Sequence, residues 1–211
     1  MSNIKIIVAG NSHGINIPLT PMHETYFSDI THDKDNIDKY NPYFCELTGL
    51  YYGWKNIVKD EDIVGFEQRK RTFRLSENEI NDILKDYDVI AYRHNNENPI
   101  KAMQSTKKGK ELALAAAIVS VNDEKFGKYL YKKLKENHCY EGNMFIAKKE
   151  TINKYLNFIF NTLAEFDKNH NFKISRIDGY IAEYLFGPWL EYNGLKIKNQ
   201  KRKNTSTGKI C

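Results

Sequence analysis

The chain has 211 residues, and its 41% hydrophobic content is enough for a single buried core. Its formal net charge is +5, but residues 196–211 contain six lysine and arginine residues and no acid, so the preceding 195 residues sum to −1. The slightly negative charge of residues 1–195 argues against a basic nucleic-acid-binding surface on that part of the chain.

The chain begins with a predicted buried strand over 4–9, which is almost entirely apolar. The strand leads into a glycine-containing loop, and ligands of open α/β sheets lie beyond the carboxyl ends of such strands. Gly10, Asn11, Ser12 and His13 are therefore candidates for nucleotide contact, although an ordinary glycine turn explains the loop equally well. The loop matches neither the dinucleotide-binding glycine pattern nor the P-loop pattern, which argues against both kinds of site.

Residues 15–42 are rich in proline and polar residues, which predicts irregular structure. A helix is predicted over 43–56, since Asn41 can cap it, the following proline suits a first helical position, and apolar residues recur at helical spacing. Glu46 and Thr48 lie among the apolar residues of this helix and need polar partners if they are buried. Glu46 is either a ligand-binding acid or a structural acid bonded to backbone.

Strands and helices alternate through the rest of the chain. The pattern predicts strands over 63–66, 88–92, 143–147 and 195–198, and helices over 77–85, 105–119, 123–136, 152–166 and 178–190. This alternation is typical of an α/β sandwich with a central mixed sheet. We expect one domain over residues 1–195 and a basic, flexible tail over 196–211.

The cysteines and the amino-terminal residues indicate the cellular compartment in which the protein is expected. Cys45, Cys139 and Cys211 are odd in number and form no Cys-x-x-Cys pair, which argues against a disulfide framework and a structural zinc site. The apolar start is too short for a signal sequence or a membrane span. We therefore expect a cytoplasmic protein. Its basic tail is either solvated or touches the inner face of a membrane.

Four blocks of sequence, in the same order, resemble a family of bacterial capsule and exopolysaccharide proteins labelled as a domain of unknown function, DUF4422. The blocks lie within residues 35–56, 65–73, 142–150 and 176–185 and include Asn41-Pro42-x-Phe44-Cys45-Glu46-Leu47-Thr48 and Arg176-x-x-Gly179-Tyr180-x-x-Glu183. Some members are assigned as galactofuranosyltransferases. The resemblance implies a GT-A-like, Rossmann-like fold of the nucleotide-diphospho-sugar transferases. It also implies a glycosyltransferase that extends a surface glycan from a UDP-linked donor, UDP-galactofuranose or UDP-galactose.

Such a transfer requires a hold on the nucleotide, positive charge for the departing diphosphate and a base for the acceptor hydroxyl. In addition to the loop residues 10–13, we assign contacts with the nucleotide or the donor sugar to the polar residues of the block 35–56. These are Asp35, Asn36, Asn41, Glu46 and Thr48. Two further candidates lie in the later blocks: Asn143, which follows a glycine at a strand start where a ligand can approach closely, and Gly179.

A basic turn follows the strand 63–66 at the edge of the sheet where ligands bind. Arg69, Lys70 and Arg71 can neutralise a diphosphate without a metal, and a guanidinium can do so with two hydrogen bonds. We predict metal-independent transfer with Arg71 as the main phosphate partner and Arg69 and Lys70 assisting. The alternative is a solvated turn with no ligand.

A divalent Mn or Mg ion held by an Asp-x-Asp pair is the other way to bind a diphosphate. Three segments match that spacing: Asp33-Lys34-Asp35 and the triplets at 60–62 and 86–88. The last two precede their strands, so they belong at the opposite edge of the sheet from the ligand. We therefore predict no metal ligand and no cofactor. If a metal is required, Glu67 and Asp35 are the candidate ligands.

Two carboxylates near the last helix are candidates for the base. Glu183 matches the family position, and Asp178 can instead cap the helix. We expect Asn36, Glu46, Arg71 and Glu183 to share one pocket at the carboxyl edge of the sheet. Two alternatives remain: a catalytically silent module that binds nucleotides or carbohydrates, and a membrane-surface or RNA-binding protein driven by its tail.

Overall fold

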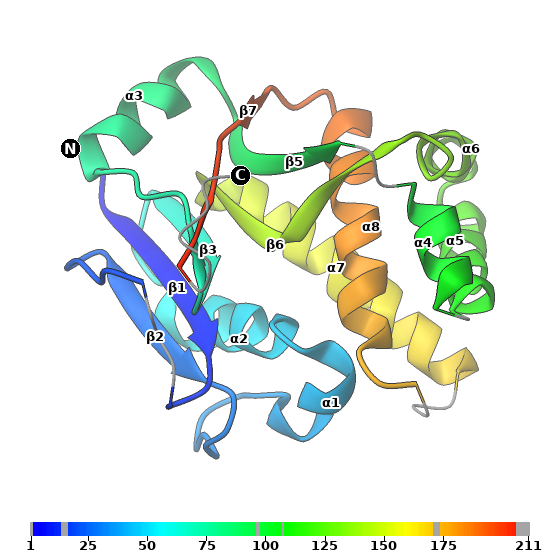
Figure 1. Cartoon of the computed structure of the whole chain (residues 1–211), viewed down its shortest axis with the longest axis horizontal. Coiled ribbons are helices and arrows are strands. Elements are labelled where there is room, and N and C mark those ends of the chain that lie inside the picture. Colours follow the sequence, from blue (N-terminus) through cyan, green and yellow to red (C-terminus); the bar gives the residue numbers. More distant parts are fainter. Residues whose placement is uncertain (1, 14–16, 96–97, 107, 171–173, 206–211) are drawn as a thin grey trace.

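The computed structural model describes residues 2–13, 17–95, 98–106, 108–170 and 174–205. Its centre is an eight-stranded sheet, in which β2, β1, β3, β6, β5 and β7 follow one another in that order (Figure 1). The two remaining strands form a short extension, because β4 pairs with β3 and β8 pairs with β4. The strands are β1 (Ile4–Gly10), β2 (His23–Phe27), β3 (Ile63–Gln68), β4 (Arg71–Thr72), β5 (Val89–Asn95), β6 (His138–Lys148), β7 (Ile197–Asn199) and β8 (Lys203–Asn204).

The sheet is mixed, as predicted. β1 runs parallel to β2 and β3, β6 runs antiparallel to both β3 and β5, and β7 runs parallel to β5. The carboxyl ends of β1, β2, β3 and β5 therefore meet at the same edge of the sheet. This is the edge where open α/β sheets bind ligands.

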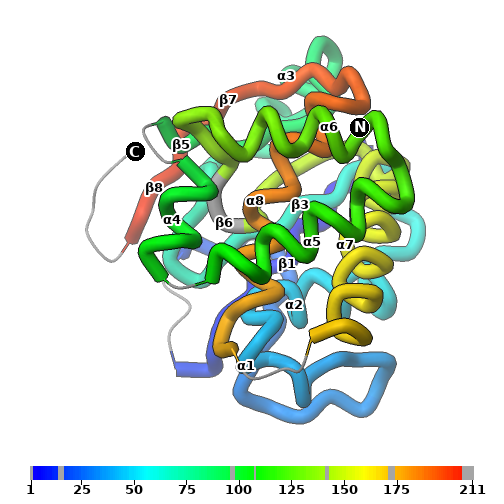
Figure 2. Tube along the Cα trace, turned by 90° about the vertical axis from the view of Figure 1, so that its right-hand side faces the viewer, coloured from blue at the N-terminus to red at the C-terminus, as the bar shows by residue number. Residues whose placement is uncertain are grey.

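Helices cover both faces of the sheet. They are α1 (Asn41–Phe44), α2 (Leu47–Tyr52), α3 (Glu77–Asp86), α4 (Pro99–Ser105), α5 (Gly109–Asn122), α6 (Glu124–Lys133), α7 (Lys149–Asn169) and α8 (Ile177–Tyr192), with a 3-10 turn η1 (Asp38–Tyr40) and a π turn η2 (Gly53–Ile57). Figure 2 shows α5 and α6 as an outer layer over α8, and both contact that helix.

Alternation along the central strands creates two cores. Ile6 faces a smaller core that α3 closes with Ile80 and Leu84. The next residue, Ile7, faces the larger core, which contains buried side chains of α1, α2 and α4 to α8. Side chains alternate between the faces of a strand, so a continuous apolar run such as 4–9 is what a doubly covered strand requires.

The predicted helix over 43–56 is in fact three pieces. Cys45 adopts a positive φ of 51°, which ends α1, and the chain then restarts as α2 and finishes as η2. Apolar periodicity continues through the break, because all three pieces pack on the same core. Gly49 allows that close packing, since a Cβ there would lie 2.8 Å from the Ala9 Cβ.

Other boundaries also differ from the predictions. The segment 15–42 was expected to be irregular, but it contains β2, an edge strand paired only with β1 among the described strands. The helix predicted over 105–119 is α4 followed by α5, and β6 is longer than the predicted 143–147. The start of α6 was predicted correctly at Asp123, whose side chain accepts a hydrogen bond from the Phe126 amide at 2.9 Å.

The basic tail is folded over much of its length, contrary to the expectation that it is flexible from residue 196. Ile197 pairs with Val89 in parallel register, and Asn204 pairs with Arg71 in the short extension. Arg202 is buried, with its guanidinium carbon 4.9 Å from the centre of the Tyr92 ring. Residues 206–211 of the predicted tail lie outside the described residues. No helix among the described residues is long and apolar enough to cross a membrane.

Candidate functional site at the carboxyl edge of the sheet

A cavity of about 430 Å³ opens at the carboxyl edge of the sheet, and we call it the carboxyl-edge cavity. It lies where the ends of β1 and β3 approach the α1–α2 segment and the residues just before α8. Its lining comes from five segments of the chain: Ala9, Gly10 and Asn11; Tyr26 and Ser28; Asn41, Pro42, Cys45, Glu46 and Thr48; Gln68 and Arg69; and Ser175 and Arg176.

On the side of the cavity formed by the sheet, the ends of β1 and β3 hold the guanidinium of Arg69 in place. The Arg69 backbone amide donates to the Ala9 carbonyl at 3.0 Å, which keeps the chain after β3 alongside the end of β1. The Arg69 side chain then donates from Nη1 to Asn11 Oδ1 at 2.7 Å. Gly10 makes this approach possible, because a Cβ at that position would lie 2.6 Å from the Arg69 Cβ.

The helix side of the cavity is fixed by buried hydroxyl groups. Thr48 is fully buried, and its hydroxyl donates to the Cys45 carbonyl at 2.8 Å with a second contact to Asn41 Oδ1 at 3.2 Å. Tyr26 donates its hydroxyl to Asp38 Oδ1 at 2.6 Å. Thr48 therefore has the polar partners that a buried hydroxyl in an apolar helix needs. Its bond to Asn41 also holds the Asn41 amide at the cavity wall.

Glu46 is the acid of the carboxyl-edge cavity, and its side chain is half-buried. Desolvation raises the pKa of this carboxyl, although a hydrogen bond from its own backbone, the nearby Arg176 charge, the Asn143 side chain and Arg71 all act in the opposite direction. A carboxylate with a raised pKa is a stronger base than one in water.

Arg176 brings a second guanidinium to the cavity and was not among the predicted site residues. It adopts a positive φ of 65° just before α8, and its backbone amide donates to the Pro42 carbonyl at 2.9 Å. Its side chain hydrogen-bonds Cys45, and its guanidinium carbon lies 5.3 Å from the centre of the Tyr180 ring. Its position in the block 176–185, beside Gly179, was the available signal.

Lys108 extends the positive charge outward from Arg176. Its ammonium donates to the Ser175 carbonyl at 3.0 Å and lies 4.3 Å from the centre of the Tyr180 ring. Desolvation and repulsion from Arg176 lower the pKa of Lys108. Two cations that repel each other favour an anionic ligand between or beside them.

Asn143 connects the sheet to the start of α8, next to the cavity. It is buried with a positive φ of 45° at an irregularity in the pairing of β5 with β6, a conformation that asparagine tolerates better than most residues. Its Nδ2 donates to the Gly179 carbonyl at 3.3 Å, and its Oδ1 accepts from the Tyr155 hydroxyl at 3.4 Å.

The structure brings six of the predicted residues into the cavity lining: Gly10, Asn11, Asn41, Glu46, Thr48 and Arg69. Arg71 and Glu183 lie outside the lining. Arg71 is close enough to lower the pKa of Glu46, and Glu183 is close enough to contribute, after burial, to the raised pKa of Tyr155. Lys70 lies at the β3–β4 turn, where its carbonyl accepts from the Thr205 amide at 2.8 Å.

The expectation that Asn36 shares this pocket with Glu46 is wrong. The Asn36 side chain donates to the carbonyls of His32 and Lys34 at 2.7 and 2.8 Å, so it braces its own loop. Asp35 instead accepts from the Tyr51 hydroxyl at 3.2 Å. Ser12 bonds Asp29 with its amide and its hydroxyl, and the adjacent His13 is exposed. Short polar side chains in loops often bond local backbone, and the sequence does not reveal which ones do.

Asp178 is also misplaced as a candidate base. It is fully buried on the first turn of α8 and is not part of the cavity lining. Its carboxyl faces Asp167 of α7. Burial raises the pKa of Asp167 to about 7, and burial with repulsion from Asp167 raises the pKa of Asp178 to about 8.

The donor set of the cavity suits an anion better than a divalent cation. Two guanidinium groups and one carboxyl face it, and no cluster of three or more His, Cys, Asp or Glu side chains suited to a metal occurs among the described residues. Of the fallback ligands, Glu67 is buried, with Oε1 accepting from the Phe73 amide at 2.8 Å and Oε2 3.6 Å from His23 Nε2. Asp35 is exposed and bonded to Tyr51.

The arrangement is that of a GT-A-like α/β fold with a cavity at the carboxyl edge of its sheet that two arginines and one glutamate line. A solved structure described as the bifunctional glycosyltransferase WbbM in its apo form matches with a TM-score of 0.80 at 20% sequence identity, over 97% of this chain and 46% of that one. This chain therefore spans about half the length of that relative.

The sequence profile of the domain of unknown function DUF4422 matches residues 18–194, and the chain belongs to that family. No protein with a curated description matches the chain.

Proposed function

We propose that the chain is a glycosyltransferase that moves a sugar from a nucleotide-sugar donor to a growing surface polysaccharide. The donor we propose is UDP-linked, UDP-galactofuranose or UDP-galactose. The observation that carries the proposal is the meeting of Arg69, Arg176 and Glu46 in one cavity at the carboxyl edge of a GT-A-like sheet. This combination supplies cations for a diphosphate and a carboxylate for a proton.

The two guanidinium groups would hold the diphosphate. As the bond between the sugar and the diphosphate breaks, negative charge grows on the leaving phosphate oxygens, and preoriented donors stabilise that charge without reorganising. Arg69 is held in place by Asn11, and Arg176 is held by the fold of its backbone onto Pro42. We assign Arg71 a supporting role, since its charge reaches Glu46 from outside the lining.

Two carboxylates compete for the role of base. Glu46 lies in the cavity with a raised pKa, and Glu183 is the residue indicated by the family resemblance. A base with a raised pKa takes the acceptor proton more readily near neutral pH. We therefore favour Glu46 as the base. We assign to Glu183, on α8, a role in binding the acceptor.

The test is a panel of nucleotide sugars applied to the purified chain. A bound donor stabilises the native state by about 2.7 kcal/mol at a concentration of 100 times Kd, which a thermal-shift experiment detects. We expect UDP-galactofuranose or UDP-galactose to raise Tm and to be hydrolysed slowly to UDP. Binding without UDP release, even with a glycan acceptor present, would favour the catalytically silent module. No binding to any member of the panel would contradict the proposal.

A tail-driven function has weaker support. Arg202 is buried against Tyr92, and the residues around it pair with the sheet, so part of the tail charge is committed to the fold. Contact with acidic lipids through the remaining lysines stays a proposal. Binding to vesicles that contain phosphatidylserine, compared with neutral vesicles, tests it.

A further inference from the structure

A second cavity lies across α1 from the carboxyl-edge cavity, and we call it the aromatic hollow. Asn41 and Pro42 of α1 line the carboxyl-edge cavity, whereas Phe44 of the same helix lines the hollow. The hollow has a volume of about 420 Å³. Apart from Phe44, its lining includes Tyr40, Tyr51, Phe160, Ala164 and Asp167.

The aromatic walls of the hollow are held rigidly. The Phe160 ring stacks on Trp54 with centroids 6.0 Å apart and planes 6° apart, and Tyr51 meets Phe160 edge-on at 5.2 Å. Trp54 is fixed in turn by a hydrogen bond from Nε1 to Asn153 Oδ1 at 3.0 Å. Phe160 and Tyr51 are half-buried, so each ring remains partly accessible.

One wall of the hollow carries a carboxyl group. Asp167 lines the hollow and is half-buried. Behind it lies the fully buried Asp178 of α8, whose side chain is hydrogen-bonded to that of Asp167. The Asp167 carboxyl is therefore a polar group that a ligand in the hollow can reach.

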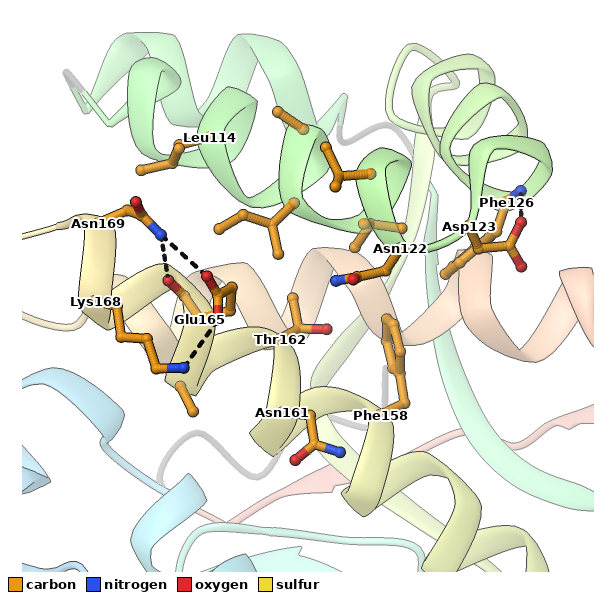
Figure 3. A pocket seen from close by; sticks show the side chains of 15 residues that line it. Leu114, Asn122, Asp123, Phe126, Phe158, Asn161, Thr162, Glu165, Lys168 and Asn169 are labelled. Carbon is orange, nitrogen blue, oxygen red and sulfur yellow. Dashed lines mark hydrogen bonds and ion pairs between the residues drawn. The ribbon is translucent and has the colours of Figure 1, made fainter.

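A longer groove adjoins the hollow along α7. Figure 3 shows this α5–α7 groove, which has a volume of about 880 Å³ and shares Ala164 and Lys168 with the hollow. Asn161, Glu165 and Asn169 of α7 and Asn122 at the end of α5 line it, together with Phe158 (Figure 3). The lining of the groove therefore combines amide and carboxyl groups with apolar surface.

We propose that the aromatic hollow binds a sugar residue of a glycan chain and that the α5–α7 groove holds the residues that follow it. Aromatic rings cover the apolar C–H faces of a pyranose or furanose, while carboxyl and amide groups bond its hydroxyls. In the hollow, the carboxyl group within reach of a sugar hydroxyl is that of Asp167. The site lies outside the carboxyl-edge cavity, and only the identity of the glycan rests on the proposed function.

The charges around the hollow favour a saccharide over an organic cation. Lysines of the chain already lie over its aromatic rings: Lys39 Nζ is 4.8 Å from the Tyr40 centroid, and Lys55 Nζ is 5.7 Å from the Tyr51 centroid. Lys168 lines the hollow as well. A cationic ligand would meet these charges and gain little from the rings.

The test uses galacto-oligosaccharides of increasing length with the whole chain, followed by saturation-transfer NMR and titration. Ala164 is exposed at the junction of hollow and groove, so Ala164→Trp fills the site without disturbing the core. We expect Ala164→Trp and Phe160→Ala each to weaken oligosaccharide binding at least about tenfold, the loss of one well-packed contact. Tyr131→Ala, an exposed aromatic on α6, is the matched control and should bind as the wild type does.

Several outcomes would overturn the proposal: no oligosaccharide binding, binding that Ala164→Trp leaves unchanged, or displacement of the oligosaccharide by tetramethylammonium. UDP binding should be the same in all four proteins, because UDP belongs to the other cavity. If oligosaccharides bind in the hollow but no nucleotide sugar binds, the proposed function fails and the glycan site stands. If nucleotide sugars bind but oligosaccharides do not, the glycan site fails and the proposed function stands.

Discussion

The Asn143 side-chain amide donates to the backbone carbonyl of Gly179 at 3.3 Å, and this bond joins the irregular part of β6 to the first turn of α8. The same side chain accepts from Tyr155 and hydrogen-bonds the Glu46 carboxyl. One buried amide therefore connects the sheet, α7, α8 and the acid of the carboxyl-edge cavity.

Asn143→Ala should lower the free energy of unfolding by about 2 to 5 kcal/mol, measured by urea denaturation. The loss combines unpaired buried groups, at about 1 to 3 kcal/mol, with the cost of about 1 to 2 kcal/mol for alanine at a positive φ. Asn143→Gly removes the amide but tolerates the φ of 45°. Full stability in the glycine variant would mean that the hydrogen bonds contribute nothing.

Arg176→Ala should weaken UDP binding by about 10- to 100-fold, because a hydrogen bond to a charged group contributes about 1.5 to 3 kcal/mol. Arg176→Lys keeps the charge but loses the planar fork, so an intermediate affinity is expected. Isothermal titration at low salt measures both. Lys132→Ala, an exposed cation on α6, is the control for a general change in charge. Equal affinity in Arg176→Ala and the wild type would remove Arg176 from the phosphate site.

Glu46→Gln should reduce kcat by about 100- to 10,000-fold with little change in the affinity for UDP, as expected for loss of a general base. Glu183→Gln is the matched variant on α8 and should change the acceptor KM more than kcat. Initial rates with a fixed donor and varied acceptor separate the two. The opposite pattern would assign the base to Glu183 and leave Glu46 as a structural acid.

The pH dependence of stability should report on the Asp167–Asp178 pair. The pKa of Asp178 rises from 3.8 to about 8 on folding, so the native state binds the proton more tightly than the unfolded chain. The stabilisation that the protonated pair gives to the folded state is therefore fully present below pH 4 and is lost as the pH rises toward 8. The free energy of unfolding should fall over this interval. Asp178→Asn removes the part of this dependence that Asp178 causes and should be more stable than the wild type at pH 8, by about 1 to 3 kcal/mol.

Denaturation curves at several pH values between 4 and 8 provide the measurement for this pair. Asp82→Asn, which changes an exposed aspartate of α3 paired with Lys85, is the control and should leave the slope with pH as it is. A wild type whose stability rises over this interval to the same extent as that of Asp178→Asn would show that the pair ionises freely.

Gly49→Ala should destabilise the fold by about 1 to 3 kcal/mol, since the new methyl group would lie 2.8 Å from Ala9 and 2.9 Å from Tyr26 in a tightly packed region. Gly109→Ala is the comparison, because the atom its methyl group meets belongs to the exposed Gln104 side chain, at 3.1 Å. That variant should stay within about 0.5 kcal/mol of the wild type in thermal unfolding. Similar losses in the two variants would show that close packing at Gly49 is not the cause.

Patterns that repeat along the chain predicted the fold well. The apolar run of β1, the capping box at Ser76 and the stripe on α7 each arise from local periodicity, and each element formed as predicted. β2 was missed because it is short, half-exposed and surrounded by loop residues. The break at Cys45 was missed because its positive φ leaves no trace in the apolar spacing of the segment around it.

The site was predictable where residues follow a strand and unpredictable where loops decide the geometry. Asn11 and Arg69 follow β1 and β3, so the sheet alone brings them together. Asn36 has the right polarity, but its side chain is used by its own loop. Arg176 is brought to the cavity by its backbone bond to Pro42 and its side-chain bond to Cys45, more than 130 positions earlier in the sequence, a separation that no local pattern spans.

The pairing of β8 with β4 also affects the order in which the protein can mature on the ribosome. The carbonyl of Lys70 accepts from the hydroxyl of Thr205, which follows it by 135 positions. During synthesis the turn that carries Arg69 and Arg71 therefore emerges long before its partner strand. A nascent chain halted after α8 would carry the helices and strands β1 to β6 but would leave this turn unbraced. Under the proposed function, competence to capture a donor should therefore arise late in translation.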